Sequence, residues 1–102
     1  MKTRQTSYGD YGIDKSEVSM ILDFCRRADD EWRTIIRSAI DAEMDKYKAD
    51  VIFKALTEGK SYDVMFQQDY LYMTKQDFYG YRRKGMEAVK RWMILYNIWK
   101  TE

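Results

Sequence analysis

The amino-acid sequence predicts an all-α fold: a small helical domain of four to five helices, with a C-terminal helix-turn-helix at about residues 61–99. Apolar residues recur at the i, i+3, i+4, i+7 spacing that gives a helix one buried face. Residues suited to cap a helix precede these runs. No segment shows the alternating pattern of a strand, and a length of 102 residues fits one domain.

The composition restricts the chemistry that the chain can perform. It has no histidine and a single cysteine, which excludes an imidazole base, a zinc site of the Cys/His kind and an internal disulfide. No nucleophile–base pair or phosphate-binding glycine loop is visible, so we expect no enzyme activity and no cofactor. No apolar run resembles a signal or a membrane span. We therefore expect a cytoplasmic protein without a membrane partner.

The first segments are a polar arm and a capped helix. Residues 1–12 show no periodic apolar pattern, which predicts a flexible arm ahead of a single helical domain at 13–102. Asp14 is a good N-cap, and Glu17 follows three residues later. The next apolar residues share one face: Val18, Ile21, Leu22 and Cys25. We expect the cysteine to be a core residue rather than a nucleophile.

A second apolar stripe follows within residues 30–58, after a cap at Asp29 and Asp30. Its members are Trp32, Ile35, Ile36, Ala39, Ile40, Met44, Tyr47, Val51, Ile52, Ala55 and Leu56. No strong breaker interrupts the stripe, so it can form one long helix. Because average helices are nearer a dozen residues, two helices split near 45–49 are the alternative. Gly59 predicts a left-handed stop.

A short helix and its connection come next. Ser61 can cap a helix over 62–68, in which Val64 and Met65 turn inward. The connection after it has little polarity, and we expect Leu71 and Met73 to pack on the core.

The last helix has a clear predicted start. Thr74 and Asp77 form the N-cap and N3 positions of a capping box, and the helix should run from Lys75 to about Trp99. Its expected buried stripe is Phe78, Tyr81, Gly85, Val89, Trp92, Tyr96 and Trp99. The glycine in this stripe would let another helix approach closely.

Charge is distributed unevenly along the chain. The formal net charge of +1 is the sum of +2 over residues 1–9, −5 over residues 10–74 and +4 over residues 75–102. An acidic body with basic ends suggests a polar partner that meets one end. Chance is the alternative, because short segments fluctuate by several charges.

The basic face of the last helix provides the candidate functional residues. Beside the buried stripe lie Lys75, Gln76, Tyr79, Arg82, Arg83 and Lys90, with Met86 among them, whereas Lys84 and Arg91 point elsewhere. Arginine can pair with guanine and glutamine with adenine, while lysine or tyrosine can hold phosphates. A short helix followed by a longer one is also the order of a helix-turn-helix. A solvated basic face is the simpler interpretation.

Two segments resemble a known family. Leu56-Thr57-Glu58-Gly59-Lys60-Ser61-Tyr62-Asp63-Val64-Met65 and Met73-Thr74-Lys75-Gln76-Asp77-Phe78-Tyr79-Gly80-Tyr81-Arg82-Arg83-Lys84-Gly85-Met86 are similar to the C-terminal half of phage-encoded late transcription regulators of the ArpU and RinA type. That half is similar to the helix-turn-helix of sigma-factor region four. The resemblance covers roughly residues 50–98 and rests on a pattern without an invariant motif. The connection at 68–73 is longer than a tight turn and unusually apolar.

The resemblance implies a phage or prophage transcription regulator that binds double-stranded DNA, with RNA polymerase or a second copy of the chain as further partners. It places Lys75, Gln76, Tyr79, Arg82 and Arg83 on the DNA-facing helix. The alternative function is a small helical interaction or assembly module, such as a homodimer, that binds no DNA. The apolar tail at 92–99 favours this second interpretation.

Overall fold

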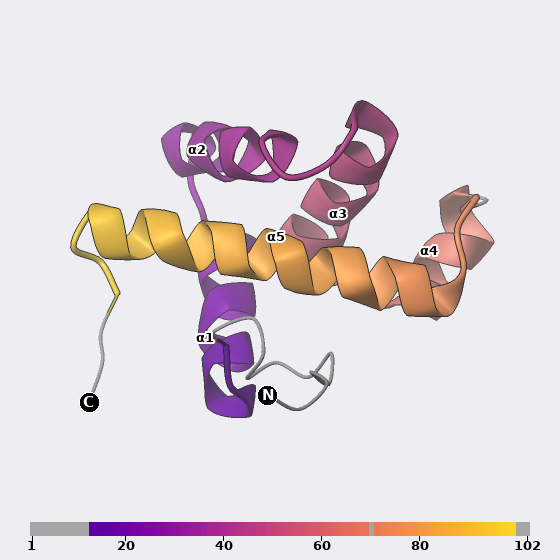
Figure 1. The fold of residues 1–102 in the computed structure, drawn as a ribbon, viewed down its shortest axis with the longest axis horizontal. Coiled ribbons are helices and arrows are strands. Elements are labelled where there is room, and N and C mark those ends of the chain that lie inside the picture. Colours follow the sequence, from indigo (N-terminus) through magenta and orange to yellow (C-terminus); the bar gives the residue numbers. More distant parts are fainter. Residues whose placement is uncertain (1–12, 70, 100–102) are drawn as a thin grey trace, which may run out of the picture.

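Residues 13–69 and 71–99 are described by a computed structural model, in which they form five α-helices and no strand (Figure 1). The predicted arm at 1–12 lies outside the described residues. The helices are α1 (Lys15–Arg26), α2 (Asp30–Asp41), α3 (Lys46–Glu58), α4 (Tyr62–Asp69) and α5 (Lys75–Leu95). The prediction of a small all-α domain of four to five helices is confirmed.

A side-chain cap marks the start of each of these helices, including α4, where the predicted cap Ser61 accepts from the backbone N–H of Val64 at 3.4 Å. Asp14 accepts a hydrogen bond from the backbone N–H of Glu17, whose carboxylate accepts one from the backbone N–H of Asp14, so α1 has the predicted capping box. The side chains of Asp29, Asp45 and Thr74 each accept from the N3 backbone N–H of α2, α3 and α5. These bonds satisfy donors that a helix end otherwise leaves without a partner.

The apolar stripe at 30–58 forms two helices, which decides between the two alternatives. The carboxylate of Asp45 accepts from the backbone N–H of Lys48 at 3.0 Å and so starts α3 after a short turn. Arg37 of α2 binds both Asp41 and Asp50, which ties the two helices together. At the other end of α3, Gly59 adopts φ +67° and ψ +39°, the predicted left-handed stop.

Helix α5 lies across the molecule and contacts each of the other four helices. In Figure 1 its N-terminal half reaches toward α4, and its C-terminal half lies beside α1 and α2. Gly85 brings α5 close to α3, since a Cβ atom there would lie 2.8 Å from Cγ2 of Ile52. The prediction that this glycine permits a close helix–helix approach is confirmed.

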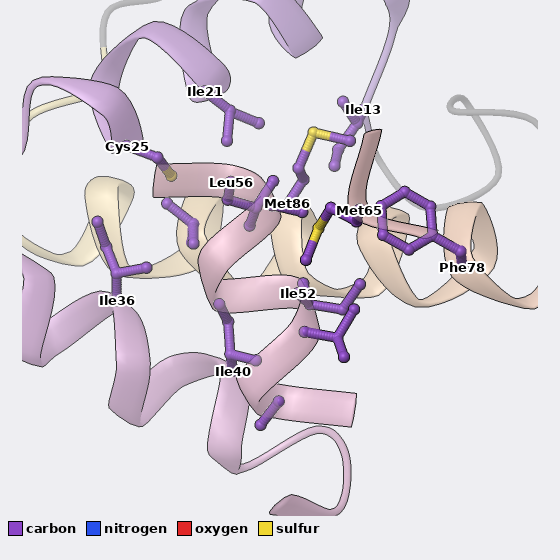
Figure 2. Packing of buried hydrophobic residues seen from close by; sticks show 14 of the residues in the cluster. Ile13, Ile21, Cys25, Ile36, Ile40, Ile52, Leu56, Met65, Phe78 and Met86 are labelled. Carbon is purple, nitrogen blue, oxygen red and sulfur yellow. The ribbon is translucent and has the colours of Figure 1, made fainter. Parts of the chain in front are cut away.

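The core gathers apolar side chains from every helix (Figure 2). The largest fully buried side chains are Phe78, Ile13, Ile21, Ile36, Ile40, Ile52, Leu56, Met65, Met86, Val89 and Cys25. Burial raises the pKa of the Cys25 thiol to about 12, because the charged thiolate is disfavoured away from water. The cysteine is therefore a core residue, as predicted. Leu71 is also buried, as predicted for the connection before α5.

Several predicted core positions are wrong. Tyr47, Val64 and Tyr96 are exposed. The short α4 buries Met65 and turns Val64 to solvent, while Tyr47 lies in the first turn of α3 because the stripe is interrupted there. These residues lie near helix ends or in the short α4, where too few turns are present for the apolar spacing to define the buried side.

The last helix ends four residues before the predicted Trp99. Asn97 adopts φ +63°, a left-handed conformation that asparagine tolerates better than most residues. The chain then folds back, and the backbone N–H groups of Ile98 and Trp99 donate to the carbonyl of Met93 at 2.8 and 3.2 Å. The signal for this stop was present in the sequence at Asn97.

Candidate nucleic-acid interface

The first turn of α5 presents polar side chains to solvent. Thr74 Oγ1 accepts a hydrogen bond from the backbone N–H of Asp77 at 3.0 Å, which fixes the start of the helix. Lys75 and Gln76 follow directly and are both exposed. A helix N-terminus carries partial positive charge, so this turn favours an anion as well as a hydrogen-bond acceptor.

Tyr79 joins α5 to α4. Its hydroxyl oxygen accepts a hydrogen bond from the backbone N–H of Tyr62 at 3.2 Å, and Tyr62 in turn donates from its own hydroxyl to the carbonyl of Met73 at 3.0 Å. The Tyr62 ring also packs edge-on against Phe78, with 5.5 Å between ring centroids. Tyr79 therefore sets the position of α4 against α5, a role that its place in the predicted DNA-contact set did not indicate.

Arginine and lysine side chains continue along this half of α5. The Arg82 guanidinium lies over the Tyr79 ring, 5.1 Å from the centroid, and both Arg82 and Arg83 are half-buried. Lys84 is exposed, and its ammonium lies 6.0 Å from the ring centroid of Tyr81. All five of these predicted contact residues lie on the N-terminal half of the helix: Lys75 and Gln76 are exposed, and Tyr79, Arg82 and Arg83 are half-buried.

Two lysines outside the predicted contact set lie beside the N-terminal half of α5. Lys84 was expected to point away from the basic face, and Lys48 belongs to α3. The Lys48 ammonium lies 4.8 Å from the ring centroid of Tyr81, so this ring has two lysines close to it. Hydrogen bonding to Tyr81 and to Asp45 raises the pKa of Lys48, so it stays charged. Sequence spacing could have found Lys84, whereas Lys48 needed the packing of α3 on α5.

Lys90 is separated from the other predicted contacts. Its ammonium lies 3.0 Å from Oε1 of Glu17 in α1 and 5.0 Å from the ring centroid of Trp99. Only 19% of the Lys90 side chain is exposed. This lysine therefore fastens the C-terminal half of α5 to α1 and to the returning tail.

The buried face of α5 is rotated from its predicted position. Met86 was placed on the basic flank, yet it is fully buried in the cluster with Ile13, Leu56 and Met65 (Figure 2). Met93 is buried as well, whereas Tyr81 and Trp92 are only half-buried. The helix turns this way because all four other helices pack against it, so its buried side is set by their combined positions. Its outward side consequently includes Gln76, Gly80 and Lys84.

A separate hollow, lined by basic and aromatic side chains, lies between α2 and α3. Arg33 and Arg37 lie over the Phe53 ring at 5.5 and 5.7 Å from its centroid, in a hollow of about 410 Å³. Arg37 also binds two carboxylates, which raise its pKa while the pKa of Asp50 is lowered, chiefly by its hydrogen bond with Arg37. Acidic neighbours therefore neutralise part of this hollow, in contrast to the start of α5.

The described residues hold neither a candidate metal site nor a helix suited to span a membrane. Within 13–69 and 71–99, no group of three or more cysteine, aspartate or glutamate side chains is arranged to hold a metal ion. In the same part of the chain, no helix combines the length and the apolar character that crossing a membrane requires.

No protein-family model matches this chain, and neither does any curated protein or solved structure. The similarity to ArpU- and RinA-type regulators therefore remains a prediction carried by the residues quoted above.

Proposed function

We propose that this protein is a transcription regulator that binds double-stranded DNA through the N-terminal half of α5. The observation that carries the proposal is the concentration of positive charge on that half. Residues 75–84 hold four basic side chains and one acidic side chain, and they include the exposed Lys75, Gln76 and Lys84. In the C-terminal half of the same helix buried residues predominate, whereas Phe78 is the buried residue of the N-terminal half.

The arrangement of α4 and α5 supports a helix-turn-helix. Met65 anchors α4 in the core, and the Tyr62–Tyr79 hydrogen bond holds it against the start of α5. Placing the second helix of such a pair in the major groove brings its N-terminal residues to the base edges. The connection before α5 is longer than a tight turn. Within its described residues 71–74, Leu71 is buried and the backbone N–H of Tyr72 donates to the Tyr47 hydroxyl at 2.8 Å, which links this stretch to α3.

The proposed contacts divide into two kinds. Gln76 and Arg83 have the donor and acceptor groups that read base edges, whereas Lys75 and Lys84 suit phosphates. Lys90 lies outside this set, because Glu17 already neutralises it. The phage or prophage origin and the partnership with RNA polymerase are implied by the resemblance alone and form part of the same proposal.

The test is fluorescence-anisotropy binding to random-sequence duplex DNA at two salt concentrations. We expect weak binding that falls steeply with salt, because each phosphate contact releases counterions. The double variant Lys75→Glu/Lys84→Glu should reduce affinity at least about tenfold, since it replaces two phosphate contacts by repulsion.

The matched control is Arg27→Glu/Lys46→Glu, which changes the net charge by the same amount at two exposed positions, the C-cap of α1 and the first residue of α3. An equal loss of affinity in both doubles would mean that net charge, and not this helix, governs binding. Absence of binding by the wild-type chain at low salt would overturn the proposal.

A second candidate function, homodimer formation, is favoured by the end of α5. Leu95 is 72% exposed and Ile94 is 53% exposed, and with Arg91 and Trp92 they border a hollow of about 430 Å³. Because neither aliphatic side chain is part of the core, Ile94→Glu/Leu95→Glu should leave the helical fold intact. Light scattering should show a dimer for the wild type and a monomer for the variant. A wild-type monomer at high concentration would exclude this candidate.

A further inference from the structure

The feature that carries a further inference is Gly80, in the interior of α5. Glycine is unfavourable in a helix interior relative to alanine, because it loses more backbone freedom on folding. Gly80 has an ordinary helical conformation, and α5 runs through it without interruption. A glycine at such a position therefore needs a reason other than backbone conformation.

The other two glycines of the described ranges have such reasons within the protein. Gly59 adopts φ +67°, and a Cβ atom there would lie 3.0 Å from the Arg26 side chain. At Gly85 a Cβ atom would lie 2.8 Å from Ile52. At Gly80, by contrast, a Cβ atom would meet nothing within 4 Å. Packing within the described part of the chain thus gives no reason to exclude a side chain from this position.

The surroundings of Gly80 are the proposed DNA contacts. Positions three and four residues away along a helix lie on the same face, about 5–6 Å apart between Cβ atoms. For Gly80 these positions are Gln76, Asp77, Arg83 and Lys84. The glycine therefore leaves a gap in the side-chain layer, and the groups around it are an amide, a carboxylate, a guanidinium and an ammonium group, of which the two cations outnumber the one anion.

We infer that Gly80 is the point at which α5 approaches duplex DNA most closely, so that the bare helix backbone lies against the groove and its flanking side chains reach base edges and phosphates. This inference rests on the proposed function and adds to it the orientation of the helix. The DNA faces the Gln76–Gly80–Lys84 side, rotated from the Lys75–Tyr79–Arg82 side that the sequence suggested. A methyl group at position 80 would hold the helix away from its ligand.

The experiment compares Gly80→Ala with the wild type in two measurements: thermal unfolding and binding to the same random duplex DNA at low salt. The melting temperature should rise by about 2–6 °C, because alanine is the better helix former and has open space. Binding should nevertheless weaken about tenfold, as expected when a packed contact is overfilled. Gly80→Gln, which is larger but equally helical, should weaken it further.

Ser19→Ala is the matched control, because it also favours helix formation at an exposed position, but on α1. It should leave DNA binding unchanged. If Gly80→Ala is stabilised and binds as well as the wild type, the inference is overturned while the proposed function stands. A fall in melting temperature would overturn the premise of open space. Failure of the wild type to bind DNA would overturn the proposed function, and the inference with it.

Discussion

The two halves of α5 belong to one helix and have opposite surroundings. Residues 75–84 carry four basic side chains and the unobstructed Gly80, and they contact α4 at one side. Residues 85–95 contribute the core positions Gly85, Met86, Ala88, Val89 and Met93. A helix of 21 residues is longer than this small core, so one part of it can be largely buried while another part remains accessible to solvent. Substitutions in the two halves should therefore have different consequences.

The largest expected effect is loss of stability at Met86. Met86→Ala removes a fully buried side chain and should lower the free energy of unfolding by about 2–5 kcal/mol. Urea denaturation followed by circular dichroism measures the change. Lys84→Ala, on the exposed half, should stay within about 0.5 kcal/mol of the wild type. Equal values for the two variants would mean that α5 is rotated as the sequence suggested.

Gly85 and Gly80 give the sharpest comparison between the halves. Alanine at position 85 gains roughly 0.5–1 kcal/mol in helix propensity, but its Cβ atom would lie 2.8 Å from a branched methyl of Ile52. Such overpacking costs about 1–3 kcal/mol, so Gly85→Ala should be less stable than the wild type. Gly80→Ala should be more stable. Thermal unfolding of both variants measures whether the melting temperature falls in Gly85→Ala and rises in Gly80→Ala.

A smaller effect is expected at the start of the helix. Thr74→Ala removes the oxygen that accepts from the Asp77 backbone N–H and should cost about 1 kcal/mol in the free energy of unfolding. Thr74→Ser keeps that acceptor and should recover most of the loss. If serine fails to rescue, the contribution of Thr74 lies in its methyl group and not in the cap.

The smallest expected effect is the loss of stability at low pH, and the carboxylates responsible for it lie outside α5. Three aspartates have a lowered pKa because each carboxylate accepts hydrogen bonds. The main donors are the Ser16 side chain and the Glu17 backbone for Asp14, the Lys48 backbone for Asp45 and the Arg37 side chain for Asp50. These contributions are present above the ordinary value of 3.8 and are lost as pH falls through the lowered values.

The melting temperature should therefore drop on acidification below that range. The drop should be smaller in Asp50→Asn, in which one of the three titrating carboxylates is absent. An unchanged acid response in this variant would remove the Arg37–Asp50 contact from the explanation.

Local chemistry in the sequence was sufficient for the helices and most of their ends. Asp14 with Glu17, Thr74 and Gly59 act through bonds and dihedral angles within a few residues, so their roles were predictable. The spacing of Ile21 and Cys25 likewise identified buried positions without knowledge of any neighbour. The split before Asp45 was left open, because the same carboxylate can cap the start of a new helix or lie on the surface of a longer one.

The tertiary structure decided which side of α5 is buried and which residues remain available. Periodicity predicts the buried stripe of a helix to within one or two positions. Met86 is turned inward by the packing of the other helices against α5, which the local pattern does not contain. Lys90 is held by Glu17, a residue 73 positions away in the chain, and no local pattern indicates that pair. The sequence by itself determined the helices, their caps and the basic character of α5. The rotation of α5 and the removal of Lys90 from the basic face depend on contacts between distant segments, which exist only once the chain has folded.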